Sequence, residues 1–108
     1  RPSQGVLQDV HWAAGAFGYF PTYTLGNVYA GCLFQKMRDD IPDLDASLST
    51  GDISQATAWL RENIHVHGSL FYPRATIEKA TGAKVTVKPL LNYIDEKYRD
   101  IYRLQRCV

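Results

Sequence analysis

The spacing of apolar residues is the feature that most limits how this chain can fold, because they recur every three or four positions along most of its length. That spacing places apolar side chains on one face of an α-helix, where they can pack against a neighbouring element. Prolines and glycines divide the pattern into segments, since proline fits the first turn of a helix and glycine often follows the last. The sequence therefore predicts an all-α fold, an irregular array of several helices.

The positions of proline and glycine also predict where these helices begin and end. The longest helix should begin at Pro21 and end at or before Ile41, because Pro42 disfavours helical geometry in the residue before it. Asp52 could be the N-cap of a later helix. Further helices are expected over residues 44–49, 53–66 and 73–81, from residues 88–89 onward, and as a short piece over residues 8–14. Residues 84–87 could be extended, but no sheet is expected from them.

Three of the predicted helices have apolar residues at helical spacing. In the last helix, from residues 88–89 onward, these are Leu90, Leu91, Ile94, Tyr98, Ile101 and Tyr102. In the longest helix the stripe comprises Leu25, Val28, Tyr29, Cys32, Leu33 and Lys36. In the helix over residues 53–66 it comprises Ile53, Ala56, Leu60 and Ile64, with Trp59 beside it. Gly26 and Gly31 interrupt the longest helix, and each costs about 1 kcal/mol relative to alanine. We expect the close approach of a neighbouring helix to compensate for these glycines.

Composition and charge exclude several classes of protein. The chain has 108 residues, of which 45% are hydrophobic and 21% charged, as in a soluble globular domain. A formal charge of +1 gives no electrostatic reason to expect nucleic acid or an anionic membrane as a partner. No apolar run approaches the roughly 20 residues of a membrane-spanning helix. Cys32 and Cys107 are far apart, and we expect them to be free thiols in a cytoplasmic protein. The start at Arg1, without methionine, suggests a piece of a longer polypeptide or, alternatively, a processed N-terminus.

Residues 5–27 combine polar and aromatic side chains in a way that is typical of active-site walls. His11, Tyr19 and Tyr23 are candidate catalytic residues, because an imidazole or a tyrosine hydroxyl can donate a hydrogen bond to the oxyanion of a tetrahedral intermediate. Gln8 could bind a substrate amide or carboxylate, and Asp9 could orient His11. The glycines of this segment would let it approach a peptide backbone.

A simpler interpretation is that His11 and Trp12 pack in the core and that the tyrosines form an aromatic patch. Other candidate sites are weaker. His65 and His67 would point apart on a helix, whereas helical zinc pairs are four residues apart, so no metal site is expected there. His67 is expected to be structural, with a role at the end of a cleft as the alternative. Cys32 lies on an apolar helix face, which would destabilise a nucleophilic thiolate.

Residues 5–27 resemble a segment of the carboxypeptidase Taq family of zinc metallocarboxypeptidases. That family carries a Gly-x-x-Gln-Asp-x-His-Trp signature, which is matched in full by Gly5, Gln8, Asp9, His11 and Trp12. Residues 17–26, 59–65, 67–68 and 90–98 are also similar to the family. The resemblance covers essentially the whole chain and corresponds to the C-terminal portion of the family's sequence.

The resemblance implies a clamp-like helical fold and a homodimer that removes C-terminal residues from peptide substrates. It also implies a zinc ion held by a His-Glu-x-x-His helix and a further glutamate, with the helix glutamate as general base. None of the 108 residues forms a His-Glu pair, so we expect the zinc ligands in an upstream segment and no metal bound by this chain. Residues 1–20 would form a substrate-cleft loop, and residues 21–108 a helical scaffold.

The resemblance also implies roles for single residues. By analogy with related peptidases, His11 would be catalytic together with Tyr19 or Tyr23, one of which would donate to the oxyanion. Gln8, Asp9 and His11 would bind the substrate near its C-terminal end. Two alternatives of another class are a stand-alone, non-catalytic helical interaction module and a regulator that pairs with a full-length subunit.

Overall fold

The computed structural model describes residues 1–5 and 9–104. The α-helices in this part of the chain are α1 (Pro21–Asp40), α2 (Leu44–Ser49), α3 (Ser54–Asn63), α4 (Pro73–Thr81) and α5 (Lys88–Tyr102), and single 3-10 turns are η1 (Pro2–Gln4) and η3 (His65–His67). No β-strand occurs among the described residues, so the all-α prediction is confirmed.

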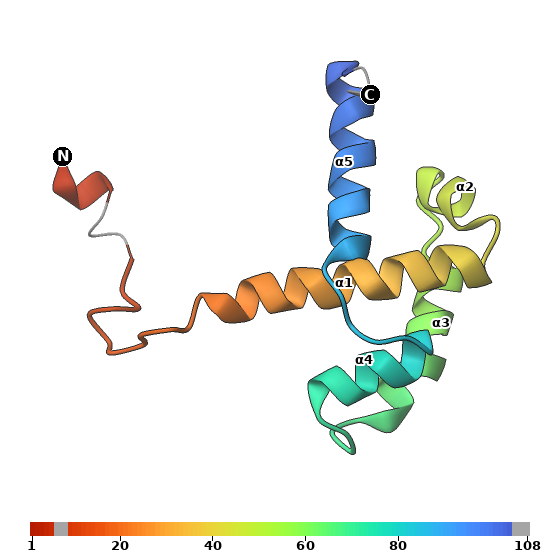
Figure 1. Ribbon diagram of the computed structural model, residues 1–108, viewed down its shortest axis with the longest axis horizontal. Helices are drawn as coiled ribbons and strands as arrows, with labels where there is room; N and C mark the ends of the chain where they lie inside the picture. The colour runs from red at the N-terminus through yellow and green to blue at the C-terminus, as the bar shows by residue number, and fades with distance from the viewer. Residues whose placement is uncertain (6–8, 105–108) are drawn as a thin grey trace.

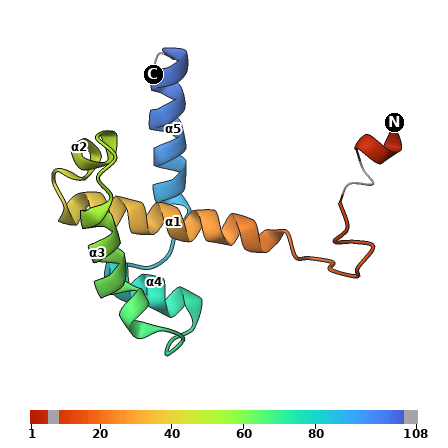
Figure 2. The ribbon, with the colours of Figure 1, turned by 180° about the vertical axis from the view of Figure 1, so that it is seen from behind.

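The long helix α1 is the central element of the molecule. It contacts α2, α4 and α5, and α3 packs on α2 and η3. α5 stands steeply on α1 and projects away from it, while the chain before α1 extends beyond the first turn of that helix (Figures 1 and 2). The radius of gyration is 17.7 Å, whereas a compact chain of this length has about 13 Å. The molecule therefore leaves open much surface that a compact domain would bury.

The main core lies where the last turns of α1 meet α2, α3 and α4. Met37, Leu44, Trp59 and Ala80 are buried there, and Leu44 is only 1% exposed. The indole Nε1 of Trp59 donates to Asp40 Oδ2 at 2.8 Å, so the buried N–H group of the largest core side chain is satisfied. This core fixes the helical scaffold at the C-terminal end of α1.

Several predicted boundaries are confirmed, and each has a local cause. Pro21 occupies the first turn of α1, and Ile41 after its last residue is extended, with φ −123° and ψ 91°. The N-cap of α3 is Ile53 and not Asp52, but Asp52 Oδ1 accepts the backbone N–H of Ser54 at 2.9 Å and satisfies one of the free donors at the start of this helix. Gly82 adopts φ +68° after α4, in the left-handed region that glycine tolerates.

One predicted helix is not observed in the described residues, and another ends earlier than predicted. The described part of residues 8–14 is not helical: residues 11–15 form turns, and Gly15 at φ +75° reverses the chain. The helix expected over residues 53–66 ends at Asn63, because Ile64 leaves helical geometry and the chain tightens into η3. In both places a local turn replaces the regular helix.

The predicted buried faces are correct only where a partner element is present. Val28 and Cys32 are buried, but Leu25 is 52% exposed, because the first turns of α1 extend past the other helices. In α3 the buried residue is Trp59, whereas Ile53 is 63% exposed. The helical period was therefore correct, and the burial was overestimated at both helix starts.

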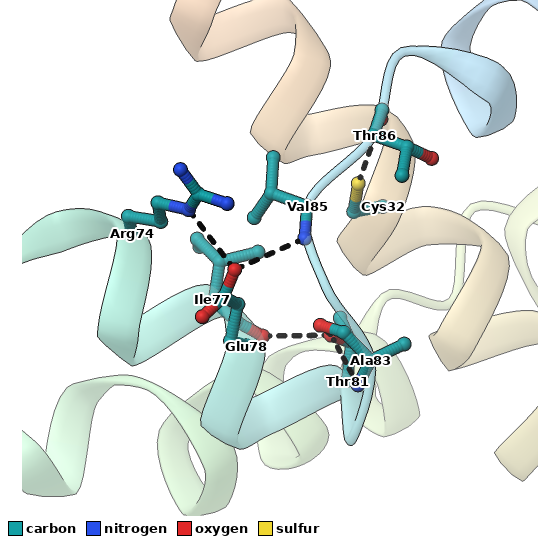
Figure 3. Close-up of polar contacts among 8 residues, drawn as sticks. All are labelled: Cys32, Arg74, Ile77, Glu78, Thr81, Ala83, Val85 and Thr86. Carbon is teal, nitrogen blue, oxygen red and sulfur yellow. Dashed lines mark hydrogen bonds and ion pairs between the residues drawn. The ribbon is translucent and has the colours of Figure 1, made fainter.

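The connection between α4 and α5 is held in place by polar contacts (Figure 3). Glu78 Oε1 accepts from Arg74 Nε at 3.0 Å and from the backbone N–H of Val85 at 3.3 Å. Cys32 is a buried free thiol, and its Sγ donates to the carbonyl oxygen of Thr86 at 3.4 Å. These contacts attach residues 83–87 to both α4 and α1. They fix the place where α5 begins.

Candidate functional site

The candidate site is the segment that leads into α1. Gly15 and Gly18 both adopt positive φ, 75° and 74°, a conformation that costs little for glycine. The backbone N–H of Ala16 donates to the carbonyl oxygen of His11 at 2.8 Å. Together these turns fold the chain back on itself, so that the start of α1 lies against His11.

Asp9 and His11 form the most defined polar contact of the site. Asp9 Oδ1 accepts the backbone N–H of His11 at 2.8 Å and lies 2.9 Å from its ring Nδ1. Nδ1 is the donor when it carries the proton, and Nε2 is then the ring nitrogen directed to a further partner. The two hydrogen bonds from His11, the backbone one foremost, hold the pKa of Asp9 below its ordinary value. The carboxylate therefore stays charged and orients the imidazole.

Aromatic rings surround this imidazole on the side of α1. The His11 ring stacks on Tyr19, with centroids 5.2 Å apart and 21° between the planes, and lies 4.9 Å from the ring of Phe20. Tyr23, one turn into the helix, meets Tyr19 edge to face at 5.4 Å. A hydrogen bond with Tyr19 raises the pKa of the Tyr23 hydroxyl. The two phenols thus form a linked pair beside His11.

Four of the five predicted site residues are therefore brought together, namely Asp9, His11, Tyr19 and Tyr23. Gln8 lies outside the described residues. Phe20, which was not among the predicted site residues, packs directly on the imidazole. Its position between a candidate tyrosine and the helix-starting proline was the only available signal.

The aromatic side chains of the candidate site are exposed to solvent. Tyr19 and Tyr23 are 45% and 54% exposed, and Trp12 is 68% exposed. The interpretation of Trp12 as a packed core residue is therefore wrong for this chain. Two exposed phenols and an oriented imidazole form a surface that can offer hydrogen bonds to a peptide carbonyl or carboxylate.

The histidines after α3 do not join this site. His67 lies in η3, partly buried, with its ring edge-on to Phe71 at 5.6 Å. η3 packs on α3, whereas residues 9–20 lie beyond the opposite end of α1 in both views (Figures 1 and 2). Within this chain His67 is a packing residue.

No metal site can be assembled from the residues that the structure describes. Nowhere among them do three or more histidine, cysteine, aspartate or glutamate side chains gather in a group that could hold an ion. The pair Asp9 and His11 supplies at most two such groups, and they bond to each other. In the same described ranges, no helix is long and apolar enough to cross a membrane.

Comparison with protein families identifies the class of protein that carries this segment. The family described as Carboxypeptidase Taq (M32) metallopeptidase matches residues 1–98. The chain therefore belongs to the carboxypeptidase Taq (M32) family of metallopeptidases, as its signature residues predicted.

Three relatives show how much of such a protein this chain represents. Carboxypeptidase 1 of Bacillus subtilis is 46% identical over 102 residues, which are 94% of this chain and 20% of the relative. Thermostable carboxypeptidase 1 of Thermus thermophilus is 46% identical over 91% of this chain and 19% of its own length. The protein of the same name from Pyrococcus furiosus is 40% identical over 89% and 19%. The chain thus spans about a fifth of the length of these relatives.

Solved structures agree with the sequence comparison. The structure described as "BsuCP Crystal Structure" superimposes with a TM-score of 0.79 at 46% identity, over 88% of this chain and 19% of that chain. "The Structure of CHT" gives the same TM-score at 42% identity, over 89% and 20%. The predicted fold class, a helical part of a larger metallopeptidase, is confirmed.

Proposed function

We propose that this chain supplies one wall of the substrate cleft in a carboxypeptidase that hydrolyses the last peptide bond of peptides. The observation that carries the proposal is the exposed cluster of Asp9, His11, Tyr19 and Tyr23, which lies inside the matched region. Its relatives are named carboxypeptidases. The homodimer and the cytoplasmic location implied by the resemblance stay predictions.

The proposed role of the cluster is to stabilise charge that develops on the scissile carbonyl oxygen. Asp9 holds the His11 ring through Nδ1. When both ring nitrogens carry a proton, Nε2 and a phenol hydroxyl can donate to that oxygen, and donors of this kind contribute about 2.7–4 kcal/mol each. Tyr19 and Tyr23 are both candidates for the phenol. The contact between Asp9 and His11 favours a positioning role for Asp9, whereas Gln8 could bind the substrate near its C-terminal end.

The metal of such an enzyme has to be bound elsewhere. Because the described residues offer no suitable group of ligands, we propose that zinc is held by the part of the complete polypeptide that corresponds to the unmatched four-fifths of the relatives. That ion would supply Lewis-acid activation when bound. The residues of this chain would orient the substrate and stabilise its charge, and this chain alone is expected to be inactive.

Release of C-terminal amino acids from N-blocked peptides by the complete polypeptide tests this proposal. We expect amino acids to be released one at a time, activity to be lost on chelation and activity to return when zinc is added. Peptides with an amidated C-terminus serve as the matched control and should be poor substrates. A folded, zinc-loaded polypeptide that releases no amino acid would contradict the proposal.

A non-catalytic helical interaction module is the second candidate. It is favoured by the many large apolar side chains that remain exposed, such as Trp12, Phe17 and Leu70. The reading frame that precedes Arg1 distinguishes the two functions. A His-Glu-x-x-His sequence there supports the peptidase, and a start codon immediately before Arg1 supports the module.

A further inference from the structure

Helix α5 carries an apolar stripe that nothing covers among the described residues. Leu91, Ile94, Tyr98 and Ile101 follow one another at intervals of three, four and three residues. Their side chains are 57%, 39%, 48% and 56% exposed. This spacing is that of the a and d positions of a heptad, which form the seam between two packed helices. We call these four residues the α5 seam.

The seam is distinct from the surface by which α5 is attached to α1. Leu90 meets α1 at Gly31, where an added Cβ would lie 2.9–3.0 Å from the Leu90 backbone and Cβ atoms. Tyr93 packs edge-on to Phe34 at 6.0 Å. Both attachments are in the first two turns of α5, and the rest of the helix projects freely (Figures 1 and 2). The seam is therefore available to another element.

The accessible surface area indicates how large a partner is needed to cover the exposed apolar surfaces. The accessible surface is 8758 Å², whereas a folded protein of this mass has about 6,100 Å². The excess of roughly 2,700 Å² is about three times what one partner buries in an interface of standard size, roughly 800 Å². Exposed apolar side chains also occur before α1 and at Leu70 and Tyr72. A second copy related by a two-fold axis covers only one self-complementary patch, so these separate surfaces favour a larger occupant.

We propose that the α5 seam is the docking site for a helix in the part of the complete polypeptide that this chain does not match. The relatives and solved structures extend over about five times the length covered here. A partner helix that crosses at about 20° would pack its own apolar side chains between those of the seam. This inference depends on family membership and not on the catalytic role of His11.

A chimaera tests the proposal without any measurement of activity. The matched segment of Carboxypeptidase 1 from Bacillus subtilis is replaced by this chain, and hydrogen exchange of the α5 amides is compared between the chimaera and the isolated chain. We expect exchange in the chimaera to be slower by at least about tenfold, because docking suppresses local opening. Equal exchange rates in the two proteins would overturn the proposal.

Substitutions separate the seam from the other faces of α5. Ile94→Gln with Ile101→Gln should lower the melting temperature of the chimaera and leave the helix content of the isolated chain unchanged, because glutamine is polar but favours a helix. Ile101→Ala should give a smaller loss if the double variant does not fold. The matched control, Asn92→Asp with Glu96→Asp on the polar face, should change neither protein.

Two further results would count against the proposed occupant. One is an isolated chain that forms a dimer, which Ile94→Asp dissociates, while the α5 amides of the chimaera still exchange rapidly. The occupant of the seam would then be a second copy of this chain. The other is a chimaera whose melting temperature is unchanged by polar substitutions at both Ile94 and Ile101, because the seam would then be uncovered. Retained folding and a monomeric isolated chain support the proposal.

Discussion

The pair Asp9 and His11 is the residue-scale feature on which the proposed site depends. In the complete polypeptide, Asp9→Asn should lower kcat more than it changes KM, because the amide oxygen can still accept both hydrogen bonds from His11 but lacks the negative charge that strengthens them. Asp9→Ala should lower kcat further. Steady-state kinetics of both variants would measure this, and kcat and KM values equal to those of the unmodified protein would exclude a positioning role.

Asp40 gives a residue-scale prediction about stability. Its carboxylate pairs with Lys36 and accepts from the indole of Trp59, and these contacts, that of Lys36 first, lower its pKa. A carboxyl group with a lowered pKa stabilises the folded state above its unfolded pKa, and this contribution is lost as the pH falls through the folded pKa.

We therefore expect Asp40→Asn to be less stable than the unmodified chain at pH 7. The difference should shrink as the pH falls below about 4, where an unfolded aspartate becomes protonated. Urea unfolding midpoints at pH 7 and pH 3 would show this convergence. A difference that stays the same at both values would mean that the charge of Asp40 is not involved.

At the scale of elements, Gly31 and Gly26 provide a matched pair of substitutions in one helix. A Cβ at Gly31 would lie 2.9 Å from the backbone nitrogen of Leu90, whereas nothing lies within 4 Å at Gly26. Gly26→Ala should gain about 1 kcal/mol from helix propensity. Gly31→Ala should be less stable than Gly26→Ala by about 1–3 kcal/mol, because α1 and α5 would be forced apart. Equal unfolding midpoints for the two variants would contradict the observed approach.

The elements that sequence reasoning predicted best are those with local signals. Pro21 and Gly82 have conformations that their own chemistry favours, so the starts and stops they predict are confirmed. Burial was less predictable. Leu25 and Ile53 fit the helical period, but the period identifies a face and not the partner that covers it. The same limit applies to Gly26, where a neighbouring helix was predicted but no atom lies within 4 Å of an added Cβ.

The candidate site was also only partly predictable, because its residue types were identified but their packing was not. The contact of Asp9 with His11 was anticipated from their residue types and not from their geometry, because a helix was expected over residues 8–14 and the structure has a turn there. The stacking of Tyr19 on His11 depends on two glycines in the left-handed region, and no pattern of side chains specifies that geometry. For the same reason the contact with Phe20 was not predicted.

At the scale of the whole molecule, the open shape and the family relationship have one explanation. The chain corresponds to about a fifth of the length of its relatives, and large apolar side chains are exposed before α1, between α3 and α4, and on α5. In the proposed arrangement, the rest of the polypeptide would cover the surfaces that a single domain buries. The exposed aromatic cluster before α1 would then line a cleft between the two parts.

The turnover number of His11→Ala in the complete polypeptide tests the central claim most directly, with zinc content and melting temperature measured alongside it. We expect kcat to fall at least about tenfold while zinc and folding are retained, because one donor to the developing charge is lost. Tyr19→Phe and Tyr23→Phe identify the second donor, and Tyr72→Phe, at a phenol that is 87% exposed, is the matched control. Unchanged kcat in His11→Ala, Tyr19→Phe and Tyr23→Phe alike would contradict the account.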